Sequence, residues 1–148
     1  DEEIIFDARD LLADTKLAPE LSNEAHYYRA KAYLDAGKTD GAMEDLKVLA
    51  KDTRNVYGAE AKYKVAQIYF DGGQTDKAEQ EVLNYIEVST PHTYWLARSF
   101  VLLADVYMKL GRNLDAKQYL LSLKQNYQAD DDIAGMIESR LEKLKTEN

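Results

Sequence analysis

Residues 30–42 read AKAYLDAGKTDGA, residues 66–78 read AQIYFDGGQTDKA, and residues 104–116 read ADVYMKLGRNLDA. The three segments align without gaps, at offsets of 36 residues (30 to 66) and then 38 residues (66 to 104). Five columns keep the same kind of residue in each copy: Ala30, Ala66 and Ala104; Tyr33, Tyr69 and Tyr107; Gly37, Gly73 and Gly111; Ala42, Ala78 and Ala116; Leu46, Val82 and Leu120. Such agreement indicates an internal repeat.

Each column of the repeat has a mechanical reason. The first alanine lets two helices approach closely, and the tyrosine one turn later fills the space between them. The glycine can take the left-handed conformation that ends a helix. Two residues later come good N-caps for a second helix, namely Thr39, Thr75 and Asn113. The second alanine lets that helix pack closely on the first. The pattern therefore predicts three copies of an antiparallel helical hairpin.

The composition agrees with a helical, folded chain and excludes several classes of protein. Of the 148 residues, 45% are hydrophobic and 31% charged, with only two prolines and seven glycines. A net charge of −8 argues against nucleic acid and anionic membrane surfaces as partners. No apolar run is long enough to insert in a membrane. The absence of cysteine removes disulfides, zinc knuckles and thiol nucleophiles.

The spacing Ala–x–x–Tyr–x–x–x–Gly–x–x–x–x–Ala, followed by an aliphatic residue, resembles the tetratricopeptide repeat over residues 22–127. The resemblance implies an all-α fold, an α-α superhelix of the tetratricopeptide solenoid type, which we expect to be right-handed with about eight helices. The chain departs from the usual period of about 34 residues. The usual early tryptophan is replaced by His26, Lys62 and Phe100, and the closing proline is missing or shifted to Pro91.

The long period also resembles repeats of bacterial cell-envelope assembly lipoproteins. Residues 90–105 resemble, more weakly, the last repeats of large Bacteroidetes proteins. We therefore expect a bacterial protein, with a cell-envelope (periplasmic) location favoured and a cytoplasmic one left open.

The repeat divides the chain, read as a single domain over 1–148, into five parts. These are the second helix of a truncated earlier repeat plus a loop (1–21), repeat 1 (22–57), repeat 2 (58–95), repeat 3 (96–128) and a C-terminal capping helix (129–148). The capping helix is expected at about 132–146, with Asp130, Asp131 and Asp132 suiting its positive N-terminus.

The predicted first helix, over residues 2–15, carries one apolar stripe formed by Ile4, Ile5, Ala8, Leu11 and Leu12. We interpret this stripe as the inner face of a helix whose covering repeat is partly missing. We therefore expect the chain to be the C-terminal fragment of a larger protein. An exposed apolar stripe favours association, which predicts a homodimer through this helix.

No catalytic or metal-binding set emerges from the sequence. His26 and His92 have no second ligand at metal-binding spacing, and both are assigned structural or surface roles. The run from Asp130 to Gly135 has the outline of a calcium loop, but Ala134 and Leu141 occupy two ligand positions. No phosphate-binding glycine loop or nucleophile elbow is present. We expect no enzyme activity, no cofactor and no metal.

In the tetratricopeptide family the first helices line a concave groove, and five positions per repeat contact ligands. In this sequence the resemblance assigns these positions to Glu24, Tyr27, Lys31, Leu34, Asp35, Glu60, Tyr63, Gln67, Phe70, Asp71, Arg98, Val101, Asp105, Met108 and Lys109. The peptide-binding residues predicted from them are Tyr27, Lys31, Leu34, Tyr63, Gln67, Phe70, Arg98, Val101, Asp105 and Met108.

Two interpretations stay open for Tyr27, Tyr63 and Phe70, which either bind a ligand or pack against neighbouring helices. The lysine and asparagine clamp that grips a chaperone's C-terminal carboxylate is absent, which disfavours that ligand. Tyr94 and Trp95 are expected to pack on the preceding repeat.

The predicted function is that of a scaffold that binds a protein or peptide. The alternative is a structural spacer or self-association module whose partner sites lie on missing repeats.

Overall fold

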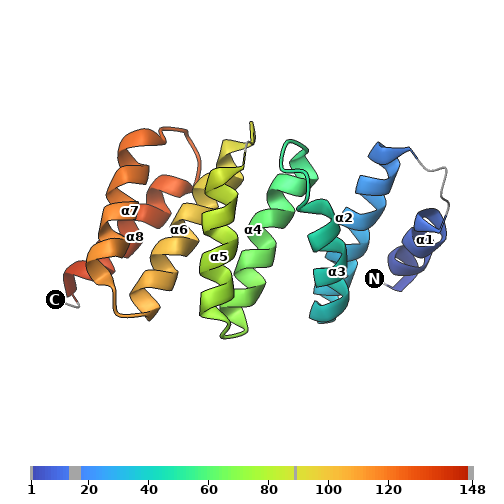
Figure 1. Cartoon of the computed structure of the whole chain (residues 1–148), viewed down its shortest axis with the longest axis horizontal. Helices are drawn as coiled ribbons and strands as arrows, with labels where there is room; N and C mark the ends of the chain where they lie inside the picture. The colour runs from blue at the N-terminus through green and yellow to red at the C-terminus, as the bar shows by residue number, and fades with distance from the viewer. Residues whose placement is uncertain (1, 14–17, 89, 147–148) are drawn as a thin grey trace.

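The computed structural model describes residues 2–13, 18–88 and 90–146. In this part of the chain it contains eight helices and no strand. The helices are α1 (Glu2–Leu12), α2 (Pro19–Asp35), α3 (Thr39–Leu49), α4 (Val56–Asp71), α5 (Thr75–Glu87), α6 (Thr93–Lys109), α7 (Asn113–Asn126) and α8 (Ile133–Thr146). They stack side by side along one long axis, with α1 at one end and α8 at the other (Figure 1). The all-α helical repeat solenoid predicted from the sequence is confirmed.

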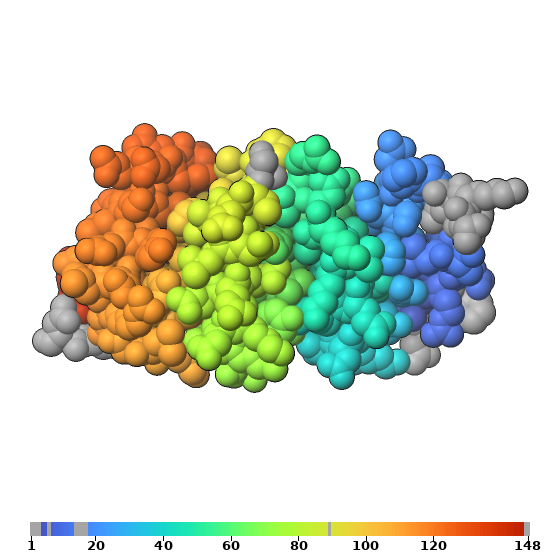
Figure 2. Space-filling view, viewed as in Figure 1, coloured from blue at the N-terminus to red at the C-terminus, as the bar shows by residue number. Residues whose placement is uncertain are grey.

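The solenoid has two layers of helices. The first helices of successive hairpins (α2, α4, α6 and then α8) contact one another along the axis, whereas among the described residues α3, α5 and α7 make no such mutual contact. Each second helix instead packs between its own first helix and the next one, and α1 packs on α2 in the same way. The stacked hairpins form an elongated body (Figure 2). The layer of first helices is therefore the continuous face of the molecule.

The three turns inside the hairpins have the same geometry. Gly37, Gly73 and Gly111 have φ angles of 73°, 80° and 77°, so the left-handed conformation predicted for this column is confirmed. In each turn the residue after the glycine donates its backbone N–H to the carbonyl of the tyrosine of the same repeat at 2.8 Å. This bond closes a Schellman-type turn, and it fixes where the second helix begins.

The prediction that Thr39, Thr75 and Asn113 cap the second helices was wrong. These residues are the first in each helix, and the capping positions belong to the residues before them, which make no side-chain capping hydrogen bond. The reason is the turn bond, which draws Lys38 and its counterparts close to the first helix. The Lys38 carbonyl accepts the first helical hydrogen bond, from the N–H of Ala42, at 3.2 Å.

The core is built from the repeated columns. All six alanines are at most 1% exposed, and Leu46, Val82 and Leu120 are at most 2% exposed. The buried side chains form two clusters, a smaller one across α2, α3 and α4 and a larger one from α4 to α8. The close approach predicted for the alanine columns is confirmed.

Helix ends differ in places from those expected. α2 begins at Pro19 and α6 at Thr93, both earlier than the divisions at 22 and 96. For α2 the reason is that proline is well tolerated in the first turn of a helix. α1 ends at Leu12, short of the predicted residue 15, and residues 14 and 15 lie outside the described residues. None of the described helices combines the length and apolar character that a membrane span requires.

Candidate protein-interaction surface

Four of the ten predicted groove residues hydrogen-bond between neighbouring first helices, namely Tyr27, Tyr63, Arg98 and Asp105. The hydroxyl of Tyr27 on α2 donates to the Glu60 carboxylate on α4, at 3.1 and 3.2 Å from its two oxygens. The Tyr27 ring lies 4.5 Å from that of Tyr57, and the Lys31 ammonium lies 5.4 Å from the Tyr27 ring centre. Burial, together with the nearby Glu60 carboxylate, raises the pKa of Tyr27 to about 12. Tyr27 therefore ties α2 to α4.

Tyr63 plays the same part between α4 and α6. Its hydroxyl donates to Gln67 Oε1 at 2.8 Å and accepts from Arg98 Nη2 at 3.0 Å. The Arg98 guanidinium lies 4.8 Å from the Tyr63 ring centre, a cation–π distance. Gln67 Nε2 in turn donates a hydrogen bond to Asp71 Oδ1 at 2.7 Å. Tyr63 is only 7% exposed, which favours the packing interpretation for its ring.

The two aromatic residues at the start of α6 point in different directions. The Trp95 ring lies 5.7 Å from Tyr63, so its predicted packing on the preceding repeat is confirmed. The hydroxyl of Tyr94 reaches the other way: it donates to Asp132, just before α8, at 2.8 Å and accepts from Arg98. The start of α6 therefore contacts elements on both sides of it.

Two other predicted residues lie away from this network. Val101 is 3% exposed and belongs to the core between helices, so its side chain is not available to a ligand. Leu34 is half-buried beside a shallow hollow of about 560 Å³, where Met43 and Ile68 also lie.

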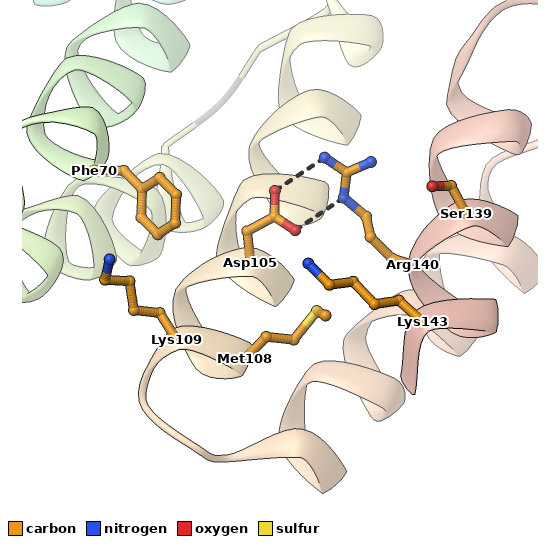
Figure 3. Close-up of a pocket in the computed structure, with 7 residues that line it drawn as sticks. All are labelled: Phe70, Asp105, Met108, Lys109, Ser139, Arg140 and Lys143. Atoms are coloured by element: carbon orange, nitrogen blue, oxygen red, sulfur yellow. Dashed lines mark hydrogen bonds and ion pairs between the residues drawn. The ribbon is translucent and has the colours of Figure 1, made fainter. Parts of the chain in front are cut away.

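The remaining three predicted residues, Phe70, Asp105 and Met108, come together around one hollow of about 520 Å³, which we call the α6–α8 hollow. Figure 3 shows its lining, formed by Phe70 of α4, by Asp105, Met108 and Lys109 of α6, and by Ser139, Arg140 and Lys143 of α8. Asp105 accepts from Arg140 Nε at 2.9 Å and from Nη2 at 3.0 Å, a bidentate pair that joins the two helices.

The contribution of α8 to this hollow was missed by the sequence reasoning. Arg140 and Lys143 belong to the predicted capping helix at about 132–146, to which no ligand-binding residue was assigned. One signal was available, because Arg140 follows Asp105 by 35 residues, close to the repeat period. This spacing is informative only once α8 is known to pack against α6 as a further first helix.

A second polar feature, inside the hairpins, was also missed. Asp45 of α3 is 1% exposed and accepts from Arg29 at 2.7 and 2.5 Å and from His26 Nδ1 at 2.7 Å. Burial opposes its ionisation, but the hydrogen bonds from Arg29 and His26 outweigh burial and hold the pKa of Asp45 below its usual value. His26 therefore has a structural role, as predicted.

The same pair of columns meets in every hairpin. In the second, the Lys62 ammonium lies 2.7 Å from Glu81 and donates to Asn84 at 2.6 Å. In the third, the rings of Phe100 and Tyr119 lie 6.1 Å apart. The column that usually carries tryptophan thus faces a matched partner on the second helix in each repeat.

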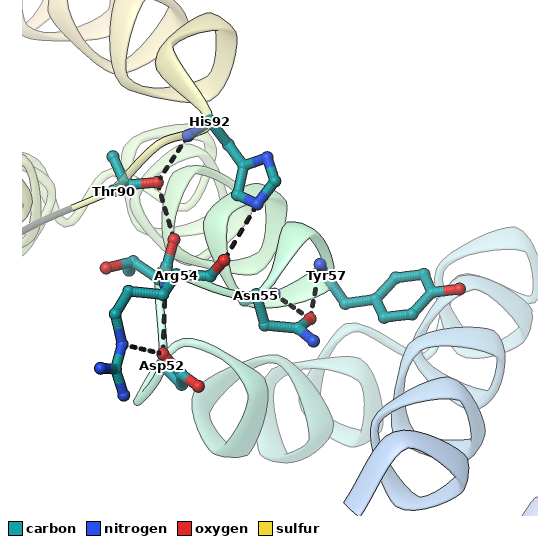
Figure 4. Close-up of polar contacts among 8 residues, drawn as sticks. Asp52, Arg54, Asn55, Tyr57, Thr90 and His92 are labelled. Carbon is teal, nitrogen blue, oxygen red and sulfur yellow. Dashed lines mark hydrogen bonds and ion pairs between the residues drawn. The ribbon is translucent and has the colours of Figure 1, made fainter.

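The loops between hairpins are also joined. His92 Nε2 lies 3.0 Å from the carbonyl oxygen of Arg54, and the hydroxyl of Thr90 donates to the Thr53 carbonyl at 2.7 Å (Figure 4). His92 is therefore structural too. At the last helix, Asp131 Oδ1 accepts from the Ile133 N–H at 2.9 Å, which confirms the capping role of the acidic run. Across the described ranges, no cluster of histidine and acidic side chains is arranged to hold a metal ion.

Comparison with known proteins agrees with this architecture. Two family models, both described as tetratricopeptide repeat, match residues 24–52 and residues 97–126. The first match covers most of the α2–α3 hairpin and the second most of the α6–α7 hairpin. No curated protein and no solved structure gives a significant match. Two segments of the chain are therefore tetratricopeptide repeats, a repeat type that generally mediates protein–protein interaction.

Proposed function

We propose that this chain is a scaffold that binds a protein or peptide across the face formed by α2, α4, α6 and α8. The observation that carries the proposal is the α6–α8 hollow, where half-buried Phe70 and Met108 lie among charged side chains. Apolar anchors surrounded by polar groups are typical of peptide recognition. The net charge of −8 disfavours nucleic acid as the partner.

The predicted residues then divide into two roles. Lys31, Leu34, Gln67, Phe70, Asp105 and Met108 offer partly or fully exposed side chains to a ligand. Tyr27, Tyr63 and Arg98 hold the first helices in register, and Val101 supports them from the core. The proposal needs no metal or cofactor.

Site-specific cross-linking of selected peptides tests this function. Peptides are first selected from a random displayed library on the intact chain. A photoreactive side chain is then placed at Met108, on the proposed face, or at Leu121, which is 44% exposed on α7 in the other layer. We expect the selected peptides to label the chain from position 108 and not from 121. Labelling from 121 alone would place binding elsewhere and refute the proposal.

A structural spacer is the second candidate, and a specific observation favours it. The contacts Tyr27–Glu60, Tyr63–Arg98 and Asp105–Arg140 tie successive first helices together. If the face serves only as a spacer, no peptide should be enriched on it, and alanine at Tyr63 should lower stability without affecting any binding.

The setting of the protein is part of the same proposal. The long repeat period, which resembles that of bacterial cell-envelope lipoproteins, supports a bacterial repeat protein at the cell envelope. The sequence of the full-length gene product tests this directly, since a secretion or lipoprotein signal in its first residues is the expected finding.

A further inference from the structure

The α6–α8 hollow differs in charge from the rest of the molecule. Its lining carries Lys109, Arg140 and Lys143 against the single carboxylate of Asp105, in a chain whose net charge is −8. The Asp105–Arg140 pair neutralises one of these cations. The local balance is therefore positive by two charges, three cations less one carboxylate.

The two lysines are the uncompensated part of this charge. Lys62 and Lys64, by contrast, are ion-paired, with Glu81 and Glu60 respectively. Lys109 and Lys143 are exposed, and the ammonium group of neither has an ion pair or hydrogen bond in the described part of the chain. Figure 3 shows Lys109 on α6, with its ammonium group on the side of Phe70, and Lys143 on α8, with its ammonium group toward Asp105.

The apolar part of the lining lies next to these ammonium groups. Phe70 and Met108 are half-buried and border the same hollow, so one ligand can bury apolar surface and meet positive charge together. A free anion would leave the apolar surface unused, and a nucleic acid needs a much longer basic track than two lysines. A volume of about 520 Å³ accommodates a few side chains.

We propose that the α6–α8 hollow binds an acidic peptide segment, with a large apolar side chain against Phe70 and Met108 and carboxylates beside Lys109 and Lys143. The inference rests on the proposed scaffold function and specifies the chemistry of its partner. Because these charges are exposed, binding weakens as ionic strength rises.

A set of three synthetic peptides tests the proposal by calorimetric titration of the whole chain. All three share the same leucine positions, and the residues between them are glutamate, glutamine or lysine. We expect the glutamate peptide to bind at least about tenfold more tightly than the glutamine peptide. The lysine peptide should bind more weakly still.

Matched charge reversals locate the binding. The double variant Lys109→Glu/Lys143→Glu should weaken binding of the glutamate peptide about tenfold. The control Lys51→Glu/Lys117→Glu changes the net charge equally at exposed lysines outside the hollow, and it should leave the affinity within about twofold. A circular dichroism melt of both variants confirms that they are folded.

The outcomes separate this inference from the scaffold function. Equal affinity for the glutamate and glutamine peptides, or equal loss in both double variants, overturns the acidic-peptide proposal but leaves peptide binding intact. Preference for a single-stranded oligonucleotide over the glutamate peptide overturns it as well. If the glutamate peptide does not bind at all, the inference fails, and the cross-linking test decides the scaffold function separately.

Discussion

The carboxylate of Asp45 lies inside the α2–α3 hairpin, where Arg29 and His26 supply its hydrogen bonds. Asp45→Asn leaves the Arg29 guanidinium without a charged partner, and we expect a loss of about 2–3 kcal/mol in the free energy of unfolding. Urea denaturation measures it. The control Glu44→Gln, at an exposed neighbour, should cost less than about 0.5 kcal/mol. An equal cost in both variants would contradict the buried pair.

The same carboxylate predicts a pH dependence. Its pKa is lower in the folded chain than its usual value, so the folded state binds fewer protons than the unfolded state on acidification. The stabilisation is complete above the unfolded pKa of about 3.9 and is lost as pH falls through the folded pKa. Unfolding free energies measured through this window should fall more steeply for the wild type than for Asp45→Asn.

Gly58 lies where the first turn of α4 meets the end of α3. A Cβ at this position would lie 1.9 Å from the carbonyl oxygen of Asp52 and 2.6 Å from that of Leu49. Both are backbone atoms, so Gly58→Ala must displace the turn, and we expect it to cost at least about 2 kcal/mol. Gly135→Ala is the matched control, since its Cβ meets nothing within 4 Å on α8. It should stabilise by about 0.5–1 kcal/mol, so thermal melts of the two variants should shift in opposite directions.

At the scale of elements, α8 depends on its acidic N-terminus. Asp131 accepts from the Ile133 N–H and, at 2.6 Å, from the hydroxyl of Tyr127. Asp131→Ala should therefore cost about 1 kcal/mol and increase hydrogen exchange in α8. Asp130 makes no such contact among the described residues, so Asp130→Ala provides the control. Exchange in α8 that is unchanged by Asp131→Ala would argue against the cap.

The exposed residues of α1 allow the predicted homodimer to be tested by mutation. Its inner side chains, Ile5 and Ala8, are 8% and 4% exposed, whereas Ile4 and Leu11 are 42% and 49% exposed. If these outer residues form a homodimer, Ile4→Glu/Leu11→Glu should abolish it. Leu114→Glu, at a residue that is 70% exposed on α7, should not. Sedimentation velocity provides the measurement, and a wild-type chain that stays monomeric at every concentration would exclude the dimer.

The elements were more predictable than the contacts between them. The alanine, tyrosine and glycine columns each serve one local purpose, so counting residues along the sequence located all three hairpins. The caps were wrong because the turn bond from Lys38 to Tyr33, rather than the polarity of Thr39, decides where α3 begins.

The candidate site was less predictable for a related reason. The family positions identify the first-helix face, but which side chains stay open depends on partners on the next helix. Tyr63 is enclosed because Trp95 and Arg98 cover it. Lys143 joins the hollow only because α8 packs as a further first helix. Contacts of this kind join residues far apart in the sequence, and local patterns do not specify them.

At the scale of the whole molecule, the unequal core clusters predict unequal stability along the solenoid. Repeat arrays behave as coupled neighbouring units, so the hairpin with the smaller apolar cluster should open first. In native-state hydrogen exchange we expect amides of α2 and α3 to exchange before those of α6 and α7. Leu103→Ala should lower protection mainly from α4 to α8, and Leu46→Ala mainly from α2 to α4. The reverse order of opening would contradict this view.

The paired columns inside the hairpins have a consequence for folding fidelity. Helices that are alike in sequence risk docking on the wrong neighbour, a known failure of repeat proteins. His26 and Arg29 need an acidic acceptor such as Asp45, and Phe100 packs on Tyr119. If α2 docked on α7, its two basic side chains would meet an aromatic ring and the Asp45 carboxylate would be left without donors. The column thus sets the third hairpin, which pairs two aromatic rings, apart from the first two, which pair a basic with an acidic side chain.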